Sequence, residues 1–137
     1  MVGSVFFFVA RVEYDTVIYW FGLVVMILGF IIEIVSDYQL SRYRKKPVGP
    51  VCEQGLWAYS RHPNLFGDWL IWLGASVLSF TVSHGWLGLF SPLILFCVMN
   101  FITIPITEKQ SLNNRGNDYA EYQQRVSQFF VWKRDVG

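Results

Sequence analysis

The sequence has 137 residues, a hydrophobic content of 53% and a formal net charge of +1. This length sets one domain as the upper limit. A charged fraction of only 15%, with 18% aromatic residues, is not typical of a small soluble domain. The balanced charge and the lack of any RNA- or DNA-binding pattern give no reason to expect nucleic acid as a partner. Cys52 and Cys97 are too few for a disulfide framework and lack metal-ligand spacing, so we expect free thiols and no metal.

Long apolar runs dominate the first hundred residues and predict membrane-spanning helices. Residues 1–10 are apolar but too short to span, and no basic segment precedes them, so they fit a signal peptide poorly and could be the stub of a longer helix. Three later runs approach the 20 or so residues that a spanning helix needs, at residues 16–35, 65–80 and 86–106. Pro92, Asn100 and Pro105 lie in or beside the last run, where neighbouring helices can satisfy the freed backbone groups.

The segment after Glu108 is polar and predicts a short amphipathic helix. Asp118 and Glu121 resemble a capping pair, and aromatic or apolar residues recur at helical spacing at Tyr119, Tyr122, Val126 and Phe129. Such a helix is as compatible with an interfacial anchor as with a role in ligand binding. The predicted fold class is therefore all-α: residues 1–137 form one membrane domain, a multi-pass bundle of about three spans plus a C-terminal amphipathic helix.

The basic residues predict the orientation of this bundle. Of the eleven lysines and arginines, ten follow the first or third expected span, and only Arg11 lies on the other side. By the positive-inside rule, the C-terminus is then cytosolic and the N-terminus faces the opposite compartment. The polar segments 36–46, 55–68 and 108–125 would meet at one cytosolic rim, where they can build one site.

The stretch 55–68 holds most of the polar chemistry of the chain. Pro63 predicts that a helix starts at or just after it, with Asn64 as a plausible N-cap and Asp68 in the first turns, where a negative charge suits the helix dipole. Gly67 would leave one face open for close approach by something other than a side chain. The alternative is a helix cap with a few interfacial charges. Ionisable groups at the mouth of a membrane segment favour a ligand site instead.

The residue types near this rim suit a nucleotide-type cofactor, with a lipidic partner inside the bundle. Arginine and lysine bind phosphate, carboxylates accept hydrogen bonds from hydroxyl or amide groups, and aromatic rings stack on a base. The candidates are Arg44, Lys45, Lys46, Arg61 and Arg125 for phosphate, Asp37 and Asp68 as acceptors, and Trp57, Tyr59 and Tyr122 for stacking. No glycine-rich nucleotide loop of the soluble folds is present. Binding of anionic lipid explains the basic run 42–46 equally well.

The run Gly55-Leu-Trp-x-Tyr-Ser-Arg-His-Pro-Asn-x-Phe-Gly-Asp68 resembles the membrane family related to the C-terminal domain of steroid 5α-reductases. That family belongs to a wider group with sterol reductases and isoprenylcysteine carboxyl methyltransferases. The resemblance covers the chain from about Phe21 to Trp132, including the tail 105–132. It also includes Ser36-Asp-Tyr-x-Leu40 with Arg44 and Lys45, Pro105-x-x-Glu108 and Tyr119-x-x-Tyr122-x-x-Arg125. It implies a transmembrane bundle with a cofactor pocket that opens to the cytosol.

The resemblance also implies roles for individual residues. Asp37 and Arg44 match NADPH-contacting positions, and Asn64 and Asp68 match a pair that holds the cofactor in the reductases. With the positions shared more widely, and with Tyr59 and Gly67 from the residue pattern, the predicted cofactor-binding set is Asp37, Arg44, Tyr59, Arg61, His62, Asn64, Gly67, Asp68, Glu108, Tyr122 and Arg125. No catalytic residue is assigned. Glu33 and Tyr59 are the nearest substitutes for a proton donor.

The expected function is NADPH-dependent reduction of a carbon–carbon double bond in a lipid or steroid-like substrate. The alternative is an S-adenosylmethionine-dependent methyltransferase, although that branch typically has two adjacent glutamates at Glu108-Lys109 and usually lacks the Asn64 and Asp68 pair. The reductases carry further helices before the position of Phe21, so this chain would need self-association or a partner to complete its pocket. The other hypothesis is that it is a truncated, non-catalytic membrane protein. The expected location is the endoplasmic reticulum membrane in a eukaryote or the inner membrane in a bacterium.

Overall fold

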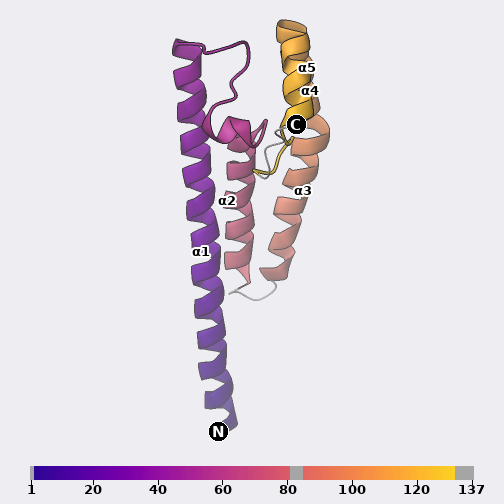
Figure 1. Ribbon diagram of the computed structural model, residues 1–137. Helices are drawn as coiled ribbons and strands as arrows, with labels where there is room; N and C mark the ends of the chain where they lie inside the picture. The colour runs from indigo at the N-terminus through magenta and orange to yellow at the C-terminus, as the bar shows by residue number, and fades with distance from the viewer. Residues whose placement is uncertain (1, 81–84, 132–137) are drawn as a thin grey trace.

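A computed structural model of the chain describes the backbone of residues 2–80 and 85–131, and side chains from residue 16 onward (Figure 1). The described part is all-α, as predicted. A helical rod of three consecutive pieces, α3, η3 and α4, runs beside α2, and η3 is a π-helical turn. The elements are α1 Val2–Lys45, η1 Gly55–Ala58, α2 Pro63–Ser79, η2 Gly85–Leu89, α3 Phe90–Val98, η3 Met99–Thr103, α4 Ile104–Arg115 and α5 Asn117–Arg125.

Helix α1 is longer than the sequence predicted. The expected stub at residues 1–10 and the expected span at 16–35 are joined, because residues 11–15 continue the helix without a break. The polar segment that follows Val35 is also helical and ends at Lys45, two residues before Pro47. A proline disfavours helical geometry at the residue before it, which accounts for the position of this end.

Glycines on facing sides of α1 and α2 bring the two antiparallel helices into backbone contact. A Cβ atom added at Gly67 would lie 2.7 Å from the carbonyl oxygen of Gly29, and one at Gly74 would lie 2.6 Å from that of Gly22. Each helix therefore carries two glycines seven residues apart on its contact face. Small residues at this spacing allow close helix packing where lipid supplies no hydrophobic driving force.

The rod accommodates both of its prolines, as the sequence predicted. The carbonyl of Pro92 accepts a hydrogen bond of 2.9 Å from the indole Nε1 of Trp69. Pro105 is the second residue of α4 and follows the π-helical turn directly, at a position where its missing N–H is least costly. The side-chain amide of Asn100 donates to the carbonyl of Phe96 at 3.0 Å. Neighbouring side chains thus satisfy backbone groups along this irregular helix.

Two helical segments are long and apolar enough to cross a membrane, Thr16–Lys45 and Trp86–Arg115. Their large apolar side chains point outward rather than into a core; Val17 is 70% exposed and Phe101 is 75% exposed. These features indicate a membrane protein. Helix α2 has 17 residues, about one turn short of a typical span, so the third expected crossing stays a prediction.

The C-terminal segment departs from the prediction. Helix α5 ends at Arg125, and Val126 has extended geometry, so the amphipathic helix predicted to reach Phe129 is one turn shorter. Phe129 instead packs in the gap between α2 and the rod, with its ring 5.6 Å from that of Phe66 and 5.5 Å from that of Phe96. Burial of an aromatic ring there outweighs one more helical turn. Trp132, Lys133 and Arg134 lie outside the described residues.

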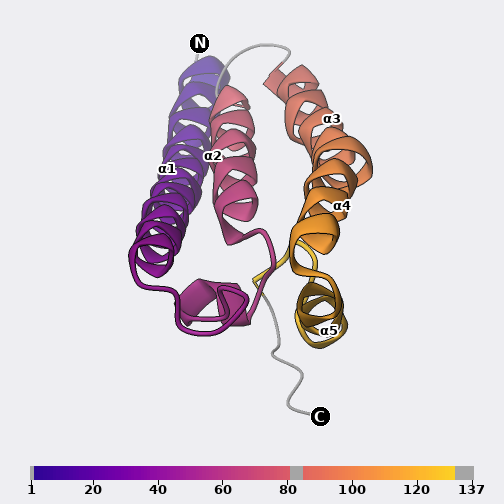
Figure 2. The same ribbon diagram turned by 90° about the horizontal axis from the view of Figure 1, so that it is seen from above.

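The polar segments gather at the end of the molecule away from the N-terminus (Figures 1 and 2). Seen from above, α1 and α2 lie side by side, the α3–α4 rod stands opposite, and η1 and α5 lie near the ends of the helices. The sequence predicted that segments 36–46, 55–68 and 108–125 would converge, and the structure confirms it.

Candidate functional site

A cavity of about 270 Å³ lies where these segments meet. Its walls come from the end of α1, the loop before α2, the first turn of α2, the rod and α5. The polar residues that line it are Arg44, Cys52, Arg61, His62, Asn64, Thr103, Thr107, Ser111, Arg115, Tyr119 and Tyr122. Five of the residues predicted to bind a cofactor are therefore brought to one cavity: Arg44, Arg61, His62, Asn64 and Tyr122.

The extended segment 60–62 is fixed by the C-terminal tail. The amide of Arg61 donates to the carbonyl of Ser127 at 2.8 Å, and the hydroxyl of Ser60 donates to the carbonyl of Phe129 at 2.7 Å. The same hydroxyl oxygen accepts a hydrogen bond of 3.1 Å from the amide of His62. Pro63 then begins α2, as predicted, but Asn64 is not its N-cap: it lies inside the first turn, and His62 is the cap residue.

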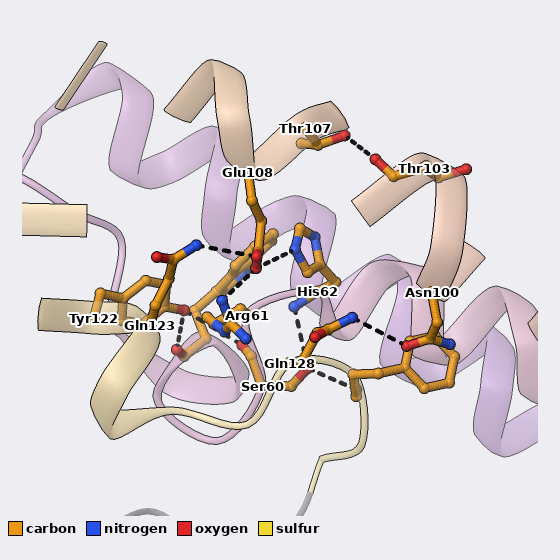
Figure 3. Close-up of polar contacts among 12 residues, drawn as sticks. Ser60, Arg61, His62, Asn100, Thr103, Thr107, Glu108, Tyr122, Gln123 and Gln128 are labelled. Carbon is orange, nitrogen blue, oxygen red and sulfur yellow. Dashed lines mark hydrogen bonds and ion pairs between the residues drawn. The ribbon is translucent and has the colours of Figure 1, made fainter. Parts of the chain in front are cut away.

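Glu108 joins three segments through its carboxylate (Figure 3). One oxygen contacts Arg61 Nη1 at 2.5 Å and His62 Nε2 at 3.1 Å, and the other accepts a hydrogen bond of 3.1 Å from the side chain of Gln123. All three ionisable groups are buried, with 9% of Arg61 exposed. A buried carboxylate needs several such partners to offset its lost hydration. The network therefore ties the start of α2 to α4 and α5.

Tyr122 is the most deeply buried polar residue of the cavity lining. Its hydroxyl donates to the carbonyl of Trp57 at 2.5 Å, and its side chain is almost fully buried. Burial raises the pKa of Tyr122 far above its usual value, and burial likewise raises the pKa of Tyr119 to about 12. Both phenols stay neutral at physiological pH. Burial also raises the pKa of the Cys52 thiol, which disfavours the reactive thiolate.

Two buried polar atoms of residues that line the cavity have no hydrogen-bond partner in the described part of the chain. They are Nε of Arg61, a donor, and Oδ1 of Asn64. Buried polar groups in native proteins are nearly always satisfied, so such atoms call for a ligand or water. Both residues line the cavity, which makes it the candidate site for a ligand.

A second hollow of about 360 Å³ adjoins the cavity. Asp37, Ser41 and Lys45 line it, together with Leu40 and Arg44, which also line the cavity. Arg44 therefore borders both spaces. A ligand longer than the cavity can extend past Arg44 toward Asp37.

The other predicted residues lie outside the cavity lining. Gly67 faces the backbone of α1, so helix packing accounts for the close approach expected there. Tyr59 is 44% exposed, and Arg125 pairs with Glu53 at the surface. Asp68 lies one turn beyond Asn64 along α2. Glu108 does not line the cavity, but it contacts Arg61 and His62, which do.

Four lining residues on the rod were not among the predicted set. Thr103, Thr107, Ser111 and Arg115 lie four residues apart, which places them on one face of the helix. Arg115 also donates to the carbonyl of Pro50 at 3.2 Å and stacks over the ring of Tyr43. The signal was present in the sequence, since hydroxyl residues recur every fourth position where an apolar span ends.

The fold and the cavity define the class: an all-α chain with two helices able to cross a membrane and a polar cavity at one end. A family model described as "Protein of unknown function (DUF1295)" matches residues 8–126, and the chain belongs to this family. The family is part of the membrane clan of the steroid 5α-reductases and isoprenylcysteine carboxyl methyltransferases. The resemblance is thus confirmed at the level of the clan. No curated protein and no solved structure gives a significant match.

Proposed function

We propose that the chain binds NADPH in the cavity and serves as a membrane-embedded reductase of a carbon–carbon double bond in a lipid or steroid-like substrate. The observation that carries the proposal is that two residues lining a cavity rimmed by further arginines each have a buried atom without a partner among the described residues, Arg61 Nε and Asn64 Oδ1. A ligand that presents both hydrogen-bond donors and anionic acceptors satisfies the two atoms together. A dinucleotide has an amide, hydroxyls and phosphates of this kind.

Individual residues of the cavity lining suit individual groups of the cofactor. Arg44 and Arg115 suit phosphate, because a guanidinium donates two parallel hydrogen bonds to it. Asn64 suits an amide or hydroxyl group, and Trp57, 8% exposed, is an aromatic residue of the lining, whereas Tyr122 is too deeply buried to stack on a ring. A cavity of about 270 Å³ is small for a whole dinucleotide, so the cofactor continues past Arg44 into the second hollow beside Asp37. When bound, NADPH supplies the hydride; the chain binds and orients it.

The membrane arrangement follows from the same proposal. Helix α1 and the α3–α4 rod cross the bilayer in the same direction, so α2 returns the chain between them and makes the third crossing. The cavity end carries most of the basic residues and faces the cytosol, where NADPH is supplied. The hydrophobic substrate enters from the lipid side. The protein is then an integral multi-pass membrane protein with a cytosolic C-terminus.

S-adenosylmethionine is the second candidate ligand, and the size of the cavity favours it. About 270 Å³ is closer to the volume of a nucleoside with a short side chain than to that of a dinucleotide. Glu108 is buried among Arg61, His62 and Gln123, which is compatible with either ligand. The adjoining hollow and the arginine that borders both spaces favour the longer, phosphate-bearing ligand.

The test is the thermal unfolding of the full chain, purified in a mild detergent, with increasing NADPH or S-adenosylmethionine. Binding to the native state alone stabilises it by about 2.7 kcal/mol at a ligand concentration one hundred times the dissociation constant. We expect NADPH to raise the unfolding midpoint and S-adenosylmethionine to leave it unchanged. Asn64→Ala should weaken the NADPH effect, whereas Tyr59→Phe, at an exposed position outside the cavity, should preserve it.

The possible results separate the candidates. A response to S-adenosylmethionine alone would replace the reductase with a methyltransferase. No response to either ligand would favour a non-catalytic membrane protein. An NADPH response that Asn64→Ala leaves intact would place the cofactor outside this cavity.

A further inference from the structure

The basic run at the end of α1 presents two different faces. Arg44 lines the cavity described above, whereas Arg42 and Lys46 line a separate hollow of about 770 Å³. Two residues of α-helix turn the chain by about 200°, so Arg42 points almost directly away from Arg44. Lys46 follows the last residue of α1 and lines the hollow together with Arg42. The structure therefore divides a basic run that looks uniform in the sequence.

The separate hollow is built by the loop that follows α1. The loop folds back so that Val48 and Gln54 face the last turns of the helix. Gln39 anchors the return, because its side-chain oxygen accepts a hydrogen bond of 3.0 Å from the amide of Leu56. Gly55 lies against the amide group of Gln39 and has a φ of +60°, so a side chain at that position would be strained and would displace the Gln39 amide that anchors the loop.

The charge in this hollow is not compensated within the described part of the chain. Arg42, Lys45 and Lys46 are exposed, and none of them makes an ion pair with a described residue. The acidic residue of the loop, Glu53, is bound to Arg125. The hollow thus attracts an anion.

An apolar stripe leads from the lipid-facing part of α1 into the same hollow. Val24, Leu28, Ile31 and Val35 recur at helical spacing and are 52%, 50%, 52% and 36% exposed. Helix α2 packs on the glycine face of α1, about half a turn away, and no other described helix covers the stripe. Tyr38, 63% exposed, lies between the stripe and the cations, at the level where tyrosine favours the membrane interface. The surface is therefore complementary to one molecule with an anionic head and a hydrocarbon chain.

We propose that this hollow binds the headgroup of an anionic phospholipid, with the phosphate between Arg42 and Lys46 and an acyl chain along the stripe. The hollow shares Lys45 with the second hollow beside Asp37, but none of its residues lines the cofactor cavity, so the proposal does not depend on NADPH binding there. A soluble phosphate would satisfy the cations alone, whereas the adjoining apolar stripe specifies the lipid. Anionic lipid bound here holds the basic end of α1 against the cytosolic leaflet.

The test compares two double variants of the full chain that remove the same charge from the same end of the molecule. Arg42→Gln with Lys46→Gln empties the hollow of two cations. Arg44→Gln with Lys109→Gln leaves the hollow intact, because Arg44 faces the cavity and Lys109 lies on α4. The chain is purified in a zwitterionic detergent, and phosphatidylglycerol, phosphatidylcholine or inorganic phosphate is titrated in. Bound lipid is counted by native mass spectrometry, and the unfolding midpoint is recorded.

We expect wild type and the control variant to bind phosphatidylglycerol in preference to phosphatidylcholine, and inorganic phosphate to have no effect at the same phosphate concentration. The hollow variant should bind phosphatidylglycerol about 25-fold more weakly, since each of the two basic residues near an anionic surface contributes about fivefold. Equal losses in both variants would overturn the proposal in favour of a diffuse charge effect. Stabilisation by inorganic phosphate would replace the lipid with a soluble anion. A dimer that forms on this face without lipid would assign the stripe to a second copy of the chain. The NADPH response is measured separately, so failure of one proposal leaves the other standing.

Discussion

Replacement of Glu108 by alanine tests whether its buried network holds the cavity together. The change removes the carboxylate that contacts Arg61 at 2.5 Å, His62 at 3.1 Å and Gln123 at 3.1 Å. Arg61 is 9% exposed and would keep its charge in a site that cannot hydrate it. Loss of one partner of a buried ion pair typically costs about 3 to 5 kcal/mol. We therefore expect Glu108→Ala to lower the free energy of unfolding by about that amount.

The matched control is Glu53→Ala, which removes the ion pair with Arg125 at the surface. Those side chains are 32% and 45% exposed, and exposed pairs contribute at most about 1 kcal/mol. A second variant, Arg61→Met with Glu108→Leu, removes both buried charges together. Apolar residues of similar volume often replace such a pair without loss, so the double variant should recover much of the stability lost in Glu108→Ala.

The assay is unfolding of the purified chain by titration of a denaturing detergent into mixed micelles, followed by far-ultraviolet circular dichroism. We expect a large loss of stability for Glu108→Ala, a small loss for Glu53→Ala and partial recovery in the double variant. Equal losses of stability for Glu108→Ala and Glu53→Ala would contradict this expectation, because the buried ion pair would then contribute no more than the exposed one.

Three further changes test other parts of the structure. Gly67→Val should separate α1 from α2, because its Cβ would lie 2.7 Å from the α1 backbone, and should destabilise the chain by about 1 to 3 kcal/mol or more in the same titration. The control Cys97→Val, at an exposed position of α3, should have little effect. Similar losses in the two variants would show that the glycine contact is unimportant. Tyr122→Phe should cost about 1 to 3 kcal/mol by leaving the buried carbonyl of Trp57 without its 2.5 Å donor, whereas Tyr38→Phe, at an exposed tyrosine, should cost nothing measurable. Because burial raises the pKa of Tyr119 to about 12, its contribution to stability is complete below pH 10 and is lost as the pH rises from 10 through 12. Tyr119→Phe should remove this share of the alkaline loss and leave the share of Tyr122, whose pKa burial also raises; an unchanged pH profile would show that Tyr119 titrates normally.

The main features of the fold could be predicted because they depend on local patterns. Apolar run length marked the helices, and Pro63 marked the start of α2. The distribution of lysine and arginine predicted that the polar segments converge at one end. The continuity of α1 could not be read from the sequence, since Arg11, Glu13 and Asp15 resemble a polar boundary although they are compatible with helix. The length of α5 was missed for a tertiary reason: Phe129 gains more by packing against Phe66 and Phe96 than by extending the helix.

The candidate site was predictable only in part, because its geometry is not local. The stretch 55–68 was found, and Arg61, His62 and Asn64 do line the cavity. The roles of Gly67 and Glu108 depend on what packs against them, and the sequence does not contain that information. Gly67 contacts a backbone 38 residues earlier at Gly29, and Glu108 contacts His62 from 46 residues away. The hydroxyl stripe that ends at Arg115 was visible but gave no motif by which to recognise it.

Chemical labelling of a cysteine introduced into the cavity tests whether NADPH binds there as proposed. Thr107 lines the cavity and is exposed, so Thr107→Cys in a Cys97→Ser background offers a reactive thiol there. The native Cys52 is 3% exposed and has a raised pKa, so it reacts slowly. Tyr59→Cys in the same background places a thiol at an exposed position outside the cavity.

We expect NADPH to slow maleimide labelling of Thr107→Cys about tenfold at ten times its dissociation constant and to leave labelling of Tyr59→Cys unchanged. S-adenosylmethionine at the same concentration should slow neither. Labelling of Thr107→Cys that proceeds at the same rate with saturating NADPH, or that slows equally at both positions, would contradict binding in this cavity.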